Sequence, residues 1–223
     1  GGNLGATQLG RIEYWQAGGR CCTDAIDNSA GVDCSDHEVN IKILLSGLVR
    51  GGDMTDKQRV ALLSSMTDEV GQLVLSDNYQ QTGAVSIEAN KGFEMLNAHG
   101  QLIRKMEAAG ALDRTIEFLP DDKNLAERAQ MRVGLTSPEL AVLLAYTKIT
   151  LKEAILATTL PDAPELQQLL AEYFPAALVK QCSAEIPNHP LKREIVTTQL
   201  VNRLVNRFLA ALHIARVGDG GRD

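Results

Sequence analysis

The sequence predicts a mainly α-helical protein in which a multi-helix, bundle-like domain follows a small α/β segment. After residue 53, apolar residues recur at helical spacing in one stretch after another, and helix-start signals precede several of these stretches. A strand-like pattern is confined to the part before Gly31. Hydrophobic residues make up 44% of the 223 residues, which is enough for a packed core. We therefore expect two domains, over residues 1–52 and 53–223.

The first 26 residues combine glycine-rich breaks with one short apolar run. Gly1 to Gly5 contains three glycines in five residues, as expected of a frayed or cut end. A second break at Gly18-Gly19 precedes Arg20 to Ile26, which we predict to be a short strand.

The next segment looks like a ligand-binding turn before a helix. Ser35 and Glu38 form an S-x-x-E capping box, which predicts a helix that begins just after Ser35 and stops at Gly51-Gly52. Three small residues stand upstream, where a flat ligand could approach the backbone, and the positive end of the helix would favour a carboxylate. An ordinary turn and cap is the alternative on residue types alone. The small residues are Ser29, Ala30 and Gly31.

Later helices are predicted from their boundaries. Gly110 is expected to end a long helical stretch, and Pro190 to open the last one. We place His189 at the surface and interpret His99 and His213 as lone helical residues. The predicted helix starts are Thr55 to Gln58, Ser137 to Glu139, Thr150 to Glu153 and Asp162 to Glu165.

Composition argues against several classes of protein. Basic and acidic residues number 22 and 28, and because the positive charges are interspersed we expect no nucleic-acid binding. No run of about 18 apolar residues indicates a membrane span. The four cysteines lack C-x-x-C spacing, which favours reduced thiols in a cytoplasm. Cys34 and His37 lie near carboxylates, but such pairs are more often structural, so no metal site is predicted.

The run Asp24 to Glu38 resembles the corresponding stretch of the large NAD-specific glutamate dehydrogenases. It also resembles the N-A-G-G-V-x-x-S-x-x-E segment of the wider family. Ser29 and Ala30 differ from the two small residues at their positions in that segment, but both are small themselves. The matching positions are Asn28, Gly31, Val32, Ser35 and Glu38. Further similarity lies in 118–122, 135–146 and 191–196, so that the resemblance covers roughly residues 1 to 207.

The resemblance implies a C-terminal piece of an enzyme that converts L-glutamate, NAD and water to 2-oxoglutarate, ammonia and NADH. Residues 1–52 would be the end of its dehydrogenase domain, a remnant of the dinucleotide-binding fold. Asn3 and Asn28 would lie near the cofactor, while Val32 would contact the aliphatic part of glutamate and Ser35 its side-chain carboxylate. The family's catalytic lysine and aspartate and its G-x-G-x-x-G turn are not found, so we expect one wall of a site that is inactive alone.

One objection and two alternatives accompany this interpretation. Asp33, Asp36 and Glu38 gather negative charge where an anionic substrate would bind, so compensating positive charge is expected from outside the chain. Residues 53–223 also fit a non-catalytic helical interaction or regulatory module. A dehydrogenase for apolar amino acids would need an aliphatic residue in place of Ser35. A homo-oligomer could form through the parent protein.

Overall fold

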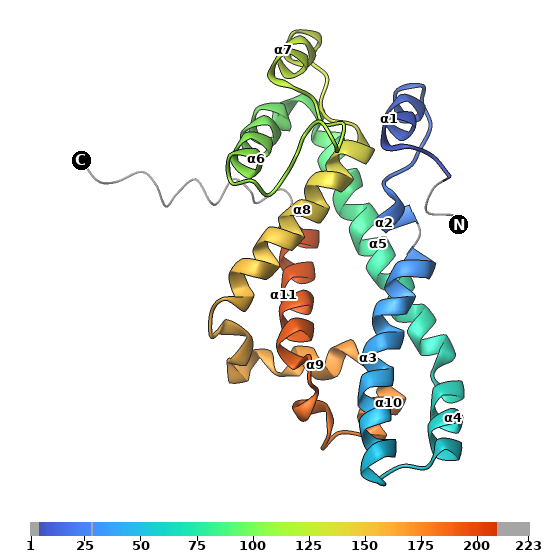
Figure 1. Ribbon diagram of the computed structural model, residues 1–223. Coiled ribbons are helices and arrows are strands. Elements are labelled where there is room, and N and C mark those ends of the chain that lie inside the picture. Colours follow the sequence, from blue (N-terminus) through green and yellow to red (C-terminus); the bar gives the residue numbers. More distant parts are fainter. Residues whose placement is uncertain (1–4, 28, 209–223) are drawn as a thin grey trace, which may run out of the picture. The chain divides into compact units, whose positions relative to one another are not determined.

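The computed structural model describes residues 5–27 and 29–208, and every regular element within these ranges is a helix (Figure 1). The prediction of a mainly helical fold is confirmed. None of the described helices is long and apolar enough to cross a membrane. The α-helices are α1 (Gln8–Gln16), α2 (Asp24–Asp27), α3 (Ser29–Gly51), α4 (Asp56–Ser65), α5 (Thr67–Lys91), α6 (Leu96–Ala108), α7 (Asp122–Met131), α8 (Ser137–Leu156), α9 (Gln168–Tyr173), α10 (Ala176–Gln181) and α11 (Lys192–Phe208). Short 3-10 helices are η1 (Gly92–Met95), η2 (Leu160–Asp162), η3 (Pro164–Leu166) and η4 (Ile186–Asn188).

The strand predicted over Arg20–Ile26 is wrong. Residues 20–23 have no regular structure, and Asp24–Asp27 forms the short helix α2. Both aspartates pair with Arg11, and the Asp27 carboxylate also accepts the Cys22 backbone N–H, which curls this segment on itself. A strand also needs a neighbour for its backbone hydrogen bonds, and the described residues supply none. The α/β remnant is therefore not seen in the described part of the chain.

The described residues form two compact units. The first comprises residues 5–27, 79–150 and 204–208, and the second comprises 29–78 and 151–203. The boundary that we expected after residue 52 refers to the domains of a longer parent, and it stays a prediction.

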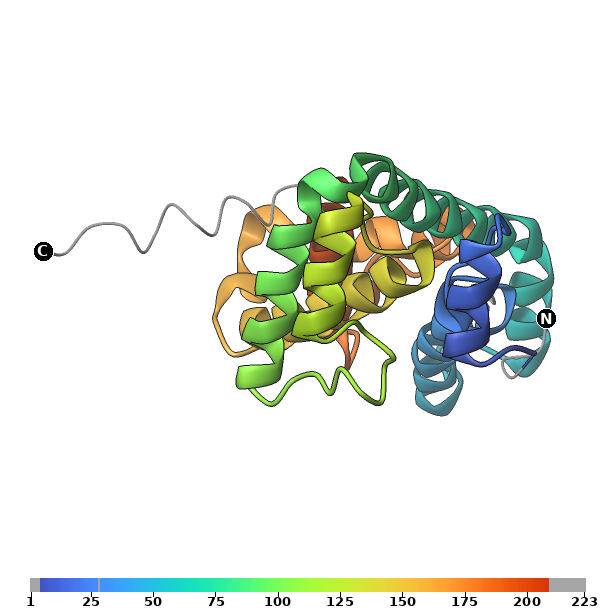
Figure 2. The same ribbon diagram turned by 90° about the horizontal axis from the view of Figure 1, so that it is seen from above.

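Pairs of polar side chains with little exposure connect the helices of the first unit. The Arg128 guanidinium of α7 donates to both carboxylate oxygens of Glu139 in α8, at 2.7 and 2.8 Å. His99 of α6 is 3.0 Å from the Glu88 carboxylate of α5, and both side chains are buried. His99 is thus part of a polar pair inside the unit and not a lone helical residue. Figure 2 shows α6 and α7 side by side, consistent with their packing.

An apolar core holds the second unit together. Leu45 of α3 and Leu178 of α10 are fully buried in it, and the start of α11 contributes Ile195 and Val196. The remaining members are Ile41, Leu44, Leu62, Met66, Leu169, Leu170, Tyr173, Phe174, Cys182 and Ile186. Because α3 carries the predicted site residues on its first turns, this core fixes their position within the unit.

Helix boundaries follow the sequence signals only in part. Thr55 forms the predicted capping box with Gln58, and Gly52 and Gly110 take positive φ angles just after α3 and α6. The cap of α8 is Thr136, whose hydroxyl accepts the Glu139 N–H, and not Ser137. Thr150 caps nothing, because it lies inside α8 and its hydroxyl donates to the Tyr146 carbonyl.

Candidate functional site

The helix that carries the predicted site begins earlier than its capping signal suggested. α3 starts at Ser29, so Ser35 is inside the helix and the predicted Ser35–Glu38 capping box is wrong. Residues 29–31 are helical as well, which also rules out the alternative of an ordinary turn there. The buried face explains the longer helix. His37, Ile41 and Leu45 are buried at four-residue spacing, and Asp33 extends the same face one turn upstream.

A polar and aromatic network fixes this part of α3 within the second unit. The Asn40 side chain donates to the Tyr173 hydroxyl at 2.8 Å, and that hydroxyl donates to the Asp36 carbonyl at 3.0 Å. The His37 and Tyr173 rings stack with centroids 4.6 Å apart. His189 is 3.1 Å from the Asn40 carbonyl. Loop and helix residues far along the sequence therefore determine how the first turns of α3 are held.

His189 is buried, with 2% of its surface exposed, so the predicted surface position is wrong. Its Nδ1 accepts the Leu191 N–H at 3.0 Å, which leaves Nε2 to donate its proton to the Asn40 carbonyl. Burial lowers the pKa of His189 below 6.5, although the Asn40 carbonyl and the charge of Glu194 oppose the shift.

Because the pKa of His189 is lowered in the folded chain, we expect the protein to lose stability in mild acid. The unfolded chain binds a proton near pH 6.5 more readily than the folded chain does, so the free energy of unfolding falls as the pH drops below that value. The slope for this group is at most about 1.4 kcal/mol per pH unit. An NMR titration of the His189 ring should give a midpoint below 6.5, and a midpoint at or above 6.5 would contradict the lowered pKa.

A groove of about 420 Å³ lies beside α3 in the second unit. Four carboxylates and one amine, that of Lys152, line it. Burial raises the pKa of Tyr173 to about 12, and the charges of Asp36, Asp33 and Asp77 add to this shift against the hydrogen bond from Asn40. The groove therefore has a negative potential. Its lining residues are Asp33, Ser35, Asp36, Val39, Asn40, Asp77, Lys152, Tyr173, Leu191, Glu194, Ile195, Thr198, Gln199 and Asn202.

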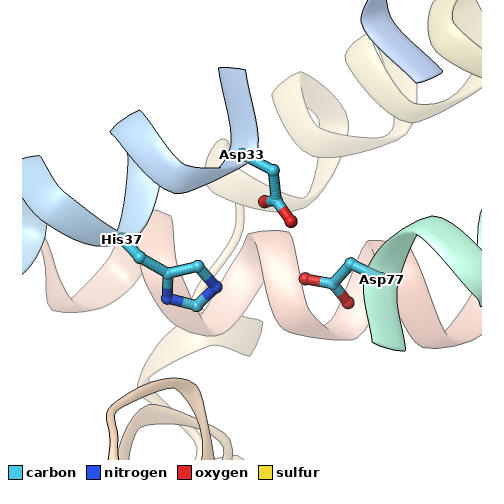
Figure 3. Close-up of side chains that lie close together, drawn as sticks. All are labelled: Asp33, His37 and Asp77. Atoms are coloured by element: carbon cyan, nitrogen blue, oxygen red, sulfur yellow. The ribbon is translucent and has the colours of Figure 1, made fainter. Parts of the chain in front are cut away.

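Asp33 and Asp77 line this groove, and together with the buried His37 they could act as ligands. Asp33 and His37 project from successive turns of α3, and Asp77 projects toward them from α5 (Figure 3). One ligand atom from each lies within 4.8 Å of the others. His37 is buried, whereas the two aspartates are half-buried. Burial lowers the pKa of His37, against the charge of Asp36, and so favours a neutral imidazole.

The chain is similar to parts of much longer enzymes. Residues 1–88 match the family described as "Bacterial NAD-glutamate dehydrogenase, catalytic domain", and residues 132–211 match "Glutamate dehydrogenase, C-terminal". It is 52% identical over 208 residues, 93% of this chain, to the NAD-specific glutamate dehydrogenase of Pseudomonas aeruginosa. It is 50% identical over 206 residues, 92% of this chain, to that of Mycobacterium tuberculosis. The chain belongs to the NAD-specific glutamate dehydrogenase family.

This membership confirms the resemblance noted in the sequence. The chain spans only about 13% of the length of these dehydrogenases. The match to the catalytic domain extends to residue 88, and it therefore includes all of α3 as well as Asp77 on α5.

The structure brings together some of the residues that the family resemblance selects. Val32 and Ser35 lie three positions apart on α3 and are both exposed, so each is accessible to a ligand. Ser35 also lines the groove, whereas Val32 does not. Asn3 and Asn28 lie outside the described residues.

Among the three possible ligands Asp33, His37 and Asp77, the sequence analysis did not select the two aspartates. The four-residue spacing of Asp33 and His37 on a helix was a usable signal, but the three-residue spacing of Cys34 and His37 drew attention instead. Asp77 had no local signal, because it comes from a different helix and meets α3 only in the folded unit.

Proposed function

We propose that this chain is part of an NAD-dependent glutamate dehydrogenase and forms one wall of its active site, followed by helical structure. The parent enzyme converts L-glutamate, NAD and water to 2-oxoglutarate, ammonia and NADH. The observation that carries the proposal is the exposure of Val32 and Ser35 on one helix inside the segment that matches the catalytic domain.

Each of these residues has a defined part in substrate binding. The Ser35 hydroxyl donates a hydrogen bond to the side-chain carboxylate of glutamate, and Val32 packs against the methylene groups of the substrate. Neither group touches the reacting carbon, so both bind and orient the substrate. Asn3 and Asn28 would contact the nicotinamide end of the cofactor.

The charges around Ser35 require help from elsewhere. Asp33, Asp36 and Glu38 surround it on α3, and Lys152 is the basic residue among those that line the groove. Bringing a substrate with two carboxylates to this face would be unfavourable unless further positive charge were present. Lysine or arginine residues from other parts of the parent enzyme would supply that charge.

NAD accepts the hydride in the parent enzyme, but the described residues do not fit a complete dinucleotide site. They contain no strand, and a phosphate-binding turn of the Rossmann type lies between a strand and a helix. We therefore infer that the phosphate-binding site for NAD belongs to the rest of the parent enzyme.

The isolated chain is accordingly expected to bind neither NAD nor glutamate and to have no dehydrogenase activity. Calorimetric titration of the 223-residue chain with NAD should show no saturable heat, whereas the full-length parent should bind NAD and produce NADH from glutamate. A dissociation constant for NAD in the low micromolar range would contradict the proposal that this chain supplies only one wall of the active site.

A further inference from the structure

The cluster of Asp33, His37 and Asp77 has the composition of a metal site. It combines one imidazole with two carboxylates from two helices of the same unit, and Figure 3 shows both carboxylates and the imidazole Nε2 turned toward a common centre. Asp33 and His37 are held in register by α3, since residues four apart on a helix lie one turn above the other. Asp77 completes the set from α5.

The spacing of the three groups suits a small cation. Zinc binds histidine nitrogen and carboxylate oxygen at about 2.0–2.2 Å, so two ligands in a tetrahedral site are about 3.4 Å apart. The ligand atoms here all lie within 4.8 Å of one another. The two aspartates are half-buried, and a reorientation of their side chains on metal binding would close this gap.

The burial and orientation of His37 are a second argument for a metal site. Only 2% of its surface is exposed, and it faces the carboxylates through Nε2. Among the described residues, its buried Nδ1 has no hydrogen-bond partner. A buried imidazole whose Nε2 faces two carboxylates can present its lone pair to a cation bound between them, as metal-ligating histidines do.

The charge around the three side chains also favours a bound cation. Asp36 and Glu194 add two carboxylates along the groove, against the single amine of Lys152. Negative charge gathered in a partly enclosed groove attracts cations and raises their local concentration.

We propose that Asp33, His37 and Asp77 form a binding site for a divalent transition-metal cation such as Mn²⁺ or Zn²⁺. The imidazole distinguishes such ions from Mg²⁺ and Ca²⁺, which prefer oxygen ligands alone. Three protein ligands leave coordination positions for water or another ligand. The bound charge would also offset the carboxylates near Ser35.

Metal binding can be tested on the 223-residue chain without any substrate. After treatment with a chelator, the chain is titrated with Mn²⁺ while electron paramagnetic resonance follows the free ion, and with Zn²⁺ by calorimetry. We expect one ion per chain with micromolar affinity, with Mg²⁺ a weak competitor. Asp77→Asn should weaken binding at least about tenfold, since even the outer partners of metal ligands have effects of 10- to 100-fold.

Matched variants identify the site. Asp68→Asn replaces an exposed aspartate on the same helix as Asp77 and should leave the affinity unchanged, as should Cys34→Ser. His37→Asn should abolish binding. Because His37 is buried and its variant could unfold, Asp33→Asn and Asp77→Asn decide the question once circular dichroism shows native helix content.

The proposal is overturned by the absence of saturable binding below millimolar Mn²⁺ and Zn²⁺. Equal affinity in the Asp77→Asn and Asp68→Asn variants would overturn it as well. Neither result depends on glutamate turnover, so the proposed dehydrogenase function stands or falls separately.

Discussion

Replacing Glu139 with alanine is expected to lower the free energy of unfolding by about 3–5 kcal/mol. Its carboxylate is 1% exposed and pairs with Arg128 through two hydrogen bonds. It also accepts the N–H and the hydroxyl of Thr136, at 2.7 and 2.8 Å. Alanine would leave the Arg128 guanidinium, only 16% exposed, without its partner. Urea unfolding of the chain, followed by circular dichroism, measures the loss.

The control for Glu139 is another glutamate of the same unit. Glu127 on α7 is half-exposed and lies 3.9 Å from Lys123, so Glu127→Ala should change stability by less than about 1 kcal/mol. A loss of less than 1 kcal/mol for Glu139→Ala as well would show that the buried ion pair does not hold α7 to α8.

Local signals in the sequence predicted features that depend on a few neighbouring residues. Thr55 and Gln58 form their capping box, and Gly52 and Gly110 end their helices in the left-handed conformation. In each case the cap or stop is completed within about five residues, so no distant packing is needed to decide it.

The same local reasoning failed where distant packing decides. Ser35 and Glu38 have the spacing of a capping box, but the buried face through His37 and Ile41 extends α3 to Ser29. His189 is polar and next to a proline, yet Asn40 and Leu191 supply both of its hydrogen bonds inside the unit. Burial of this kind becomes visible only when the partners, far apart in the sequence, are brought together.

The candidate site, too, could be predicted from the sequence only where local residues decide. The family resemblance selected Val32 and Ser35, and the structure shows both to be exposed on α3. The negative charge of Asp33 and Asp36 was visible in the sequence, but the groove was not. It could not be predicted because Asp77, Lys152 and Glu194 come from three other helices.

The second large effect is expected on catalysis. Ser35→Ala in the full-length parent should lower kcat/KM for glutamate, because it removes a hydrogen bond to a charged carboxylate, worth about 1.5–3 kcal/mol. This corresponds to roughly 10- to 150-fold. Ser35 lies inside α3 and caps nothing, so alanine, a good helix former, should leave stability nearly unchanged.

The kinetics of Ser35→Ala in the parent enzyme test the proposed substrate wall most directly. We expect the KM for L-glutamate to rise while the KM for NAD and the melting temperature stay close to their original values. Ser64→Ala, which alters an exposed helical serine away from the groove, should change none of these quantities. If Ser35→Ala left kcat/KM for glutamate within about twofold of the unaltered enzyme, this face of α3 would not border the substrate. The chain would then fit the helical interaction or regulatory module instead.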